Sequence, residues 1–118
     1  MAYKRSDRVG DLIREEIASM ILHGDIKDPR IGFITITKVR MTGDLKEARV
    51  FFSLIGTKEE VEKTREGLQS ASGYIRRTLA KRVSLRFIPS VTFTFDDSLE
   101  YSEHIERVIK EIKEKGGG

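Results

Sequence analysis

Hydrophobic residues recur at helical spacing near the start of the chain and again near its end. At the start, Ser6 or Asp7 is the expected N-cap, and the helix should end near His23-Gly24. At the end, Asp97 or Ser98 is expected to cap a last helix. The apolar faces are formed by Val9, Leu12, Ile13, Ile17, Met20 and Ile21 in the first helix, and by Ile105, Val108, Ile109 and Ile112 in the last.

Between these helices the pattern changes to alternation, which predicts β-strands. A β-rich run covers residues 33–41, Thr42-Gly43-Asp44 reads as a turn, and a second alternating run covers 47–54. These two strands should therefore form an antiparallel hairpin with one buried face. A third strand-like stretch, 85–95, contains Pro89, which has no amide donor and therefore belongs at a sheet edge or at the start of a strand.

A kinked helical region separates the hairpin from the third strand. Thr57 and Glu60 match a capping box, and helical spacing continues to residue 82 with an interruption at Ser72-Gly73. A glycine inside a helix costs about 1 kcal/mol relative to alanine. We therefore expect Gly73 either to let the helix bend over a curved sheet or to let a phosphate approach the backbone. The residue type alone favours the bend.

The element order predicts one α+β domain with a three-stranded sheet and helices packed on one face. We expect this domain to cover residues 1–115, with 116–118 as a flexible end. The 118 residues include no cysteine, which excludes disulfides and thiol nucleophiles. No apolar run is long enough for a membrane span or a signal peptide, so a soluble cytoplasmic protein is expected.

The formal net charge is only +3, but the positive charges are concentrated after the kink. Such an uneven distribution favours a polyanionic partner, although the same residues could be a solvated face paired with carboxylates elsewhere. Tyr74 could offer an aromatic surface beside the bend, but a place in the core is favoured. The candidate RNA-binding residues are Arg76, Arg77, Lys81, Arg82 and Arg86, with a second basic cluster of Lys4, Arg5 and Arg8.

The residues of the sequence do not form a recognisable active site. His23 and His104 lie on different predicted helices, without ligand partners at a known spacing. Asp96 and Asp97 are explained more simply by N-capping than by cation binding. There is no glycine-rich phosphate loop before a helix and no nucleophile elbow. We therefore expect a protein that is not an enzyme and needs no metal or cofactor.

The order of motifs resembles a type II KH-like domain, in which the usual Gly-x-x-Gly loop is replaced by Ala71-Ser72-Gly73. This combination is similar to the ribosome-binding factor A family, and the resemblance covers nearly the whole chain. The other matching segments are Arg8-Val9, Asp28-Pro29-Arg30-Ile31-Gly32, Gly43-Asp44-Leu45, Gly73-Tyr74-Ile75-Arg76-Arg77, Arg86-Phe87-Ile88-Pro89 and Phe95-Asp96-Asp97-Ser98.

The resemblance implies a monomeric assembly factor that binds the small ribosomal subunit and its precursor ribosomal RNA. It further implies a role in RNA processing, support of growth in the cold, and work alongside assembly GTPases. A kinked helix should recognise structured RNA by shape and phosphates, with little base reading. A general single-stranded RNA chaperone and a protein-interaction module remain the alternatives.

Overall fold

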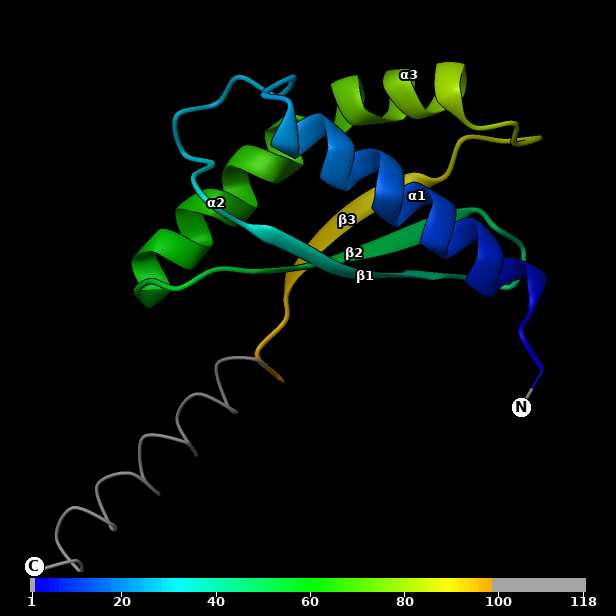
Figure 1. Cartoon of the computed structure of the whole chain (residues 1–118), viewed down its shortest axis with the longest axis horizontal. Coiled ribbons are helices and arrows are strands. Elements are labelled where there is room, and N and C mark those ends of the chain that lie inside the picture. Colours follow the sequence, from blue (N-terminus) through cyan, green and yellow to red (C-terminus); the bar gives the residue numbers. More distant parts are fainter. Residues whose placement is uncertain (1, 99–118) are drawn as a thin grey trace, which may run out of the picture.

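The centre of the fold is a mixed sheet that the helices cover on one side (Figure 1). The structure, a computed structural model, describes residues 2–98. Over these residues the predicted α+β class and element order are confirmed. The elements are α1 (Arg5–Leu22), β1 (Thr35–Met41), β2 (Glu47–Ser53), α2 (Lys58–Ser70), α3 (Ser72–Arg82) and β3 (Ser90–Phe95).

The strands lie in the order β1-β2-β3. The hairpin prediction is confirmed, because β1 and β2 pair antiparallel and Val39 lies opposite Val50. In contrast, β3 pairs parallel to β2, with Glu47 opposite Ser90. A parallel neighbour requires the chain to return along the sheet, and α2 and α3 make this crossover. Buried Pro89 directly precedes β3, which confirms its predicted place at a strand start.

All three strands are shorter than the alternation predicted, β2 only by its last residue. Strand β1 begins at Thr35, and β3 begins at Ser90, so residues 85–89 belong to the connection from α3. Phe87 in this connection is 59% exposed, because no neighbouring strand pairs with it there. The predicted last helix and the expected flexible end at 116–118 lie outside the described residues.

The hydrophobic core lies between the sheet and the helices. Val50 and Phe52 of β2 are fully buried beneath Ile13 of α1, Leu68 of α2 and other apolar side chains of the same cluster. Gly10 allows α1 to lie close to β1, because a Cβ added there would be 2.6 Å from the carbonyl oxygen of Val39. An ordinary side chain does not fit at that distance, so glycine is required by packing.

The helix termini test the capping predictions. The capping box of α2 is confirmed, since the Glu60 amide donates to Thr57 Oγ1 at 3.1 Å. The end of α1 at His23 is also confirmed. Its N-cap prediction is wrong: the N-cap is Lys4, two residues before Ser6 and three before Asp7. Asp7 instead accepts the Lys4 amide at 3.0 Å, which is the role of an N3 carboxylate.

Candidate nucleic-acid interface

The bend between α2 and α3 falls at Ala71, one residue before the predicted Ser72-Gly73. Ala71 keeps a near-helical backbone, its amide donates to the Gly67 carbonyl at 3.1 Å, and its carbonyl accepts the Ile75 amide at 2.9 Å. Among the described glycines only Gly24 has a positive φ. A Cβ on Gly73 would meet only Arg77 Nη1, at 3.3 Å. The bend therefore does not require glycine at position 73.

Helix α3 has one buried face and one charged face. Ile75 and Leu79 are fully buried, whereas Arg76, Arg77 and Lys81 are exposed. The helical spacing of the sequence dictates this division, because apolar positions four residues apart lie on the same side of a helix. We call Arg76, Arg77, Lys81, Arg82 and Arg86 the helix-face cluster.

The arginines of this cluster differ in their contacts. Arg76 Nε donates to the carbonyl oxygen of Pro89 at 3.1 Å, so this side chain joins α3 to the start of β3. Arg77 extends back over Gly73, as the 3.3 Å distance above indicates. The Arg86 guanidinium lies over the Phe87 ring, 5.5 Å from its centroid. Arg76 is therefore partly a structural residue, whereas the guanidinium of Arg77 lies at the bend.

Arg82 contacts carboxylates from the first helix and the segment after it. Its Nη1 lies 3.5 Å from Glu16 of α1, and its Nη2 lies 3.6 Å from Asp25. Within residues 2–98 it is the one member of the helix-face cluster that forms an ion pair. The Arg82 guanidinium thus takes part in ion pairs that hold α3 to α1 and to the segment after it. For this residue, the alternative of a solvated face paired with carboxylates agrees with the structure.

The second basic group, the N-terminal cluster of Lys4, Arg5 and Arg8, is exposed at the start of α1. The contact of Gly10 with Val39 places this part of α1 over the end of β1. Figure 1 shows the start of α1, the β1–β2 turn and the α3–β3 connection at the same end of the sheet. The fold thus brings the N-terminal cluster and Arg86 to one end of the molecule.

Tyr74 is not part of the core. It is 38% exposed, so the preference for a buried position was wrong. The reason is its place on α3, one residue before buried Ile75, which turns its side chain away from the apolar face. An aromatic surface therefore lies beside the bend, next to Gly73.

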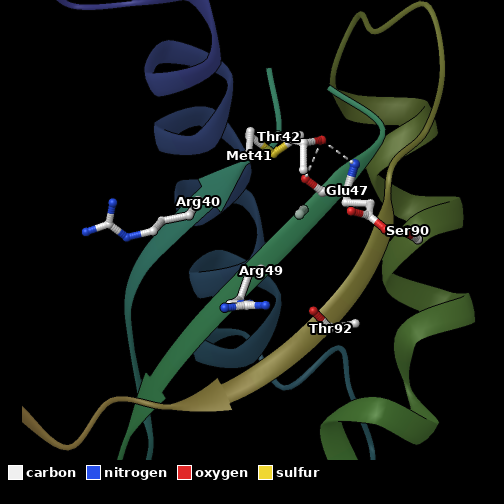
Figure 2. A pocket seen from close by; sticks show the side chains of 8 residues that line it. Arg40, Met41, Thr42, Glu47, Arg49, Ser90 and Thr92 are labelled. Atoms are coloured by element: carbon white, nitrogen blue, oxygen red, sulfur yellow. Dashed lines mark hydrogen bonds between the residues drawn. The ribbon is translucent and has the colours of Figure 1, made fainter. Parts of the chain in front are cut away.

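The fold also exposes cations that the sequence reasoning did not single out. Arg40 and Arg49 lie opposite each other on β1 and β2, on the face of the sheet away from the core. Figure 2 shows Arg49 of β2 between Arg40 of β1 and Thr92 of β3. Their only signal in the sequence was a cation at alternating strand positions, which is equally typical of any solvent-facing side.

Within residues 2–98, no three His, Asp or Glu side chains are arranged to hold a metal ion. His23 Nδ1 lies 2.8 Å from the Ser19 carbonyl oxygen. Hydrogen bonds from Ser98 and Thr37 lower the pKa of Asp96 to about 2. None of the helices between residues 2 and 98 has the length and apolar character needed to cross a membrane.

Comparison with known proteins places these features in one family. Residues 5–109 match the family model described as ribosome-binding factor A. Ribosome-binding factor A of Citrifermentans bemidjiense is 48% identical over 109 residues, covering 92% of this chain and 91% of that protein.

Solved structures show the same fold. The crystal structure of ribosome-binding factor A from Thermus thermophilus matches with a TM-score of 0.66 at 22% identity, covering 77% of this chain and 96% of that one. A homology model of T. thermophilus ribosome binding factor A, as fitted into a cryo-EM map of its complex with the 30S subunit, matches with a TM-score of 0.64 at 22% identity, covering 78% and 96%.

Proposed function

The chain belongs to the ribosome-binding factor A family, and from this premise we propose that it binds the small ribosomal subunit and assists its maturation. The observation that carries the proposal is the exposed positive face of α3, formed by Arg76, Arg77 and Lys81 beside the bend. Ribosomal RNA is the dominant polyanion of that subunit, and exposed arginines and lysines contact its phosphates without reading sequence. The T. thermophilus relative fitted into a 30S complex supports the choice of partner.

The bent pair of helices determines the mode of recognition. A Gly-x-x-Gly loop clamps a single-stranded backbone, whereas α2 and α3 are joined here by a continuous hydrogen-bonded bend at Ala71. A rigid convex surface of this kind suits structured RNA, which proteins recognise mainly by shape and phosphates. We expect Tyr74, exposed beside the bend, to add a stacking contact at most to one unpaired base.

Individual residues contribute differently. Arg77, Lys81 and Arg86 supply phosphate contacts, while Arg76 combines a phosphate contact with its bond to Pro89. Arg82 contributes less, because Glu16 and Asp25 already neutralise part of its charge. The N-terminal cluster of Lys4, Arg5 and Arg8 extends the positive surface at the end of the sheet where Arg86 lies.

Family membership supports several finer functional proposals. We propose that the protein acts as a monomer in the cytoplasm, on precursor ribosomal RNA, without catalysing a reaction. Its binding assists RNA processing and supports growth in the cold, and assembly GTPases act on the same particle. The exposed positive surface supports the RNA contact itself, and the family supports the rest.

Binding of the purified protein to small ribosomal subunits, followed by co-sedimentation over a salt series, tests the proposal. We expect saturable binding that weakens as salt rises, because each phosphate contact releases a counterion. Unstructured RNA of similar length serves as the comparison. Preference for the free strand would identify a general RNA chaperone, and binding that survives RNA digestion would identify a protein-interaction module.

Charge reversal then tests the residues. The double variant Arg77→Glu with Lys81→Glu should bind subunits at least ten-fold more weakly and with a smaller salt dependence. Lys27→Glu with Lys58→Glu makes the same charge change at exposed positions outside both basic clusters. Equal binding by the two double variants would remove α3 from the interface.

A further inference from the structure

The face of the sheet away from the helices carries its own group of cations. Strand residues alternate between faces, so Lys38 and Arg40 of β1 share this face with Arg49 of β2. Thr92 and Thr94 of β3 continue the same face, since Thr92 pairs with Arg49 and Thr94 pairs with Phe51. We call Lys38, Arg40 and Arg49 the sheet-face cluster.

Arg40 and Arg49 occupy directly opposite positions on neighbouring strands. Like charges in such a pair repel and destabilise the sheet, whereas opposite charges would stabilise it. Neither arginine forms an ion pair with any carboxylate within residues 2–98. Both arginines are therefore cations without a carboxylate partner in the described residues, which favours a bound anion.

Lys38 is held on this face by an aromatic ring. Its Nζ lies 4.7 Å from the centroid of half-buried Phe51, within cation–π distance. Acidic groups near the cluster are few. Asp96 lies near Lys38, but its carboxylate accepts hydrogen bonds from Ser98 and Thr37, and these bonds are the larger causes of its lowered pKa.

A hollow lies between the strands at the arginine pair. It has a volume of about 290 Å³, and Glu47 is the one acidic side chain that lines it (Figure 2). The hollow is at the β1–β2 turn, because its lining includes Thr42 and Ser90. This is the same end of the sheet where the N-terminal cluster and the α3–β3 connection lie. Arg40 and Arg49 therefore lie at the end of the sheet that also carries the N-terminal cluster and the α3–β3 connection.

We propose that the sheet-face cluster is a second RNA-binding surface, which holds the ribose–phosphate backbone of an RNA segment that passes around the turn end of the sheet. Guanidinium groups match phosphate geometry with paired donors. The hydroxyls of Thr92 and Thr94 supply further donors on the third strand. Arginine, lysine and threonine in this arrangement contact the backbone and do not read bases. The inference rests on the RNA partner of the proposed function but uses residues separate from the helix-face cluster.

The double variant Arg40→Gln with Arg49→Gln tests this surface. In co-sedimentation with purified small ribosomal subunits, we expect binding to fall roughly ten-fold and the salt slope to fall by about 1.5, as for two lost phosphate contacts. Lys27→Gln with Lys58→Gln removes the same charge elsewhere and should bind within about two-fold of the wild type. Equal binding by the two double variants overturns the proposal.

Two further measurements distinguish a loss of binding at the sheet-face cluster from unfolding and from an effect of the helix-face cluster. The urea midpoint of the Arg40→Gln, Arg49→Gln variant should be unchanged or higher, because repulsion is relieved, so weaker binding cannot come from unfolding. The Arg77→Glu, Lys81→Glu variant is measured in parallel. Loss only in that variant overturns the sheet-face surface and leaves the proposed function intact. Loss only in the sheet-face variant supports the surface and contradicts the role of α3.

A direct probe covers the case in which the wild type does not bind subunits. Amide chemical shifts are followed during titration of the protein with a short RNA hairpin and, separately, a glutamate peptide of equal charge. We expect RNA to shift residues 38–40, 49–51 and 92–94, and the peptide to shift them much less. Unmoved sheet amides overturn the surface, and an equal response to the peptide overturns its assignment to RNA.

Discussion

Arg76 and Pro89 are joined by a hydrogen bond from Nε to the proline carbonyl oxygen, 3.1 Å long. This bond ties the exposed side of α3 to the residue that precedes β3. Its neighbour Arg77 has no comparable contact with the rest of the fold in the described residues. The two adjacent arginines therefore have different roles: Arg76 is partly structural, and Arg77 is exposed at the bend.

Alanine substitutions should separate these roles. Arg76→Ala should lower the free energy of unfolding by about 1 kcal/mol, because a buried carbonyl loses a charged donor. Arg77→Ala should change it by less than about 0.5 kcal/mol, as expected for an exposed side chain. Urea denaturation measures both values. Equal losses of stability would show that the bond to Pro89 contributes nothing in solution.

Gly73→Ala addresses the reason for a glycine after the bend. Room for a methyl group exists, since only the flexible end of Arg77 lies within 4 Å of the added Cβ. We expect the variant to be more stable by up to about 1 kcal/mol, because alanine favours helix. We also expect weaker binding to small subunits, because the methyl group displaces Arg77 and keeps phosphates from the backbone. Greater stability with unchanged binding would leave the glycine without a functional role.

Gly10→Ala tests the close packing of α1 on β1. The new Cβ would be 2.6 Å from the Val39 carbonyl oxygen, so helix and strand must separate. The free energy of unfolding should fall by about 1–3 kcal/mol, the usual cost of overpacking. Gly43→Ala is the matched control, because nothing lies within 4 Å of a Cβ at that position. Similar stability of the two variants in urea would contradict the close approach.

Asp96 predicts a dependence of stability on acid pH. Hydrogen bonds from Ser98 and Thr37 lower its folded pKa to about 2, below the ordinary value of 3.8. The ionised carboxylate therefore stabilises the fold fully above about pH 4, and this contribution is lost as the pH falls through about 2. In Asp96→Asn, unfolding should depend less steeply on pH within that window.

Some acid dependence will remain in that variant, because Arg30 also lowers the pKa of Asp28 to about 2. Thermal unfolding between about pH 2 and 5 gives the comparison. An unchanged slope in Asp96→Asn would mean that its hydrogen bonds are absent in solution.

Local patterns in the sequence were sufficient for most of the fold. Helical spacing, the Thr57–Glu60 capping box and the hairpin turn each depend on residues a few positions apart, and each was found. These local patterns did not predict the parallel pairing of β3 with β2. That pairing joins positions as far apart as Lys46 and Ser90, which are 44 residues apart along the chain. Alternation predicts a strand but not its neighbour or its direction.

The candidate site was predictable to a different extent. The charge distribution and helical spacing were enough to place Arg77 and Lys81 on the exposed face of one helix. They could not indicate that Arg82 pairs with Glu16 or that Arg40 lies opposite Arg49, since these relationships depend on tertiary contacts. The position of Tyr74 was predicted wrongly because the exact rotation of α3 about its axis cannot be read from the sequence. Without that rotation, an aromatic residue beside buried Ile75 can be assigned to the buried or to the exposed face.

The parallel pairing of β3 also has a consequence for the order of folding. The β1–β2 hairpin closes over a short turn, whereas the Ser90 amide must reach the Lys46 carbonyl across the whole α2–α3 crossover. Contacts so distant in sequence form late, because closing a long loop costs entropy before any contact compensates. During synthesis, β3 emerges last among the described elements, and Arg76 gains its Pro89 partner only then. One side chain of the basic face of α3 is thus held by a contact that forms only when the start of β3 is in place.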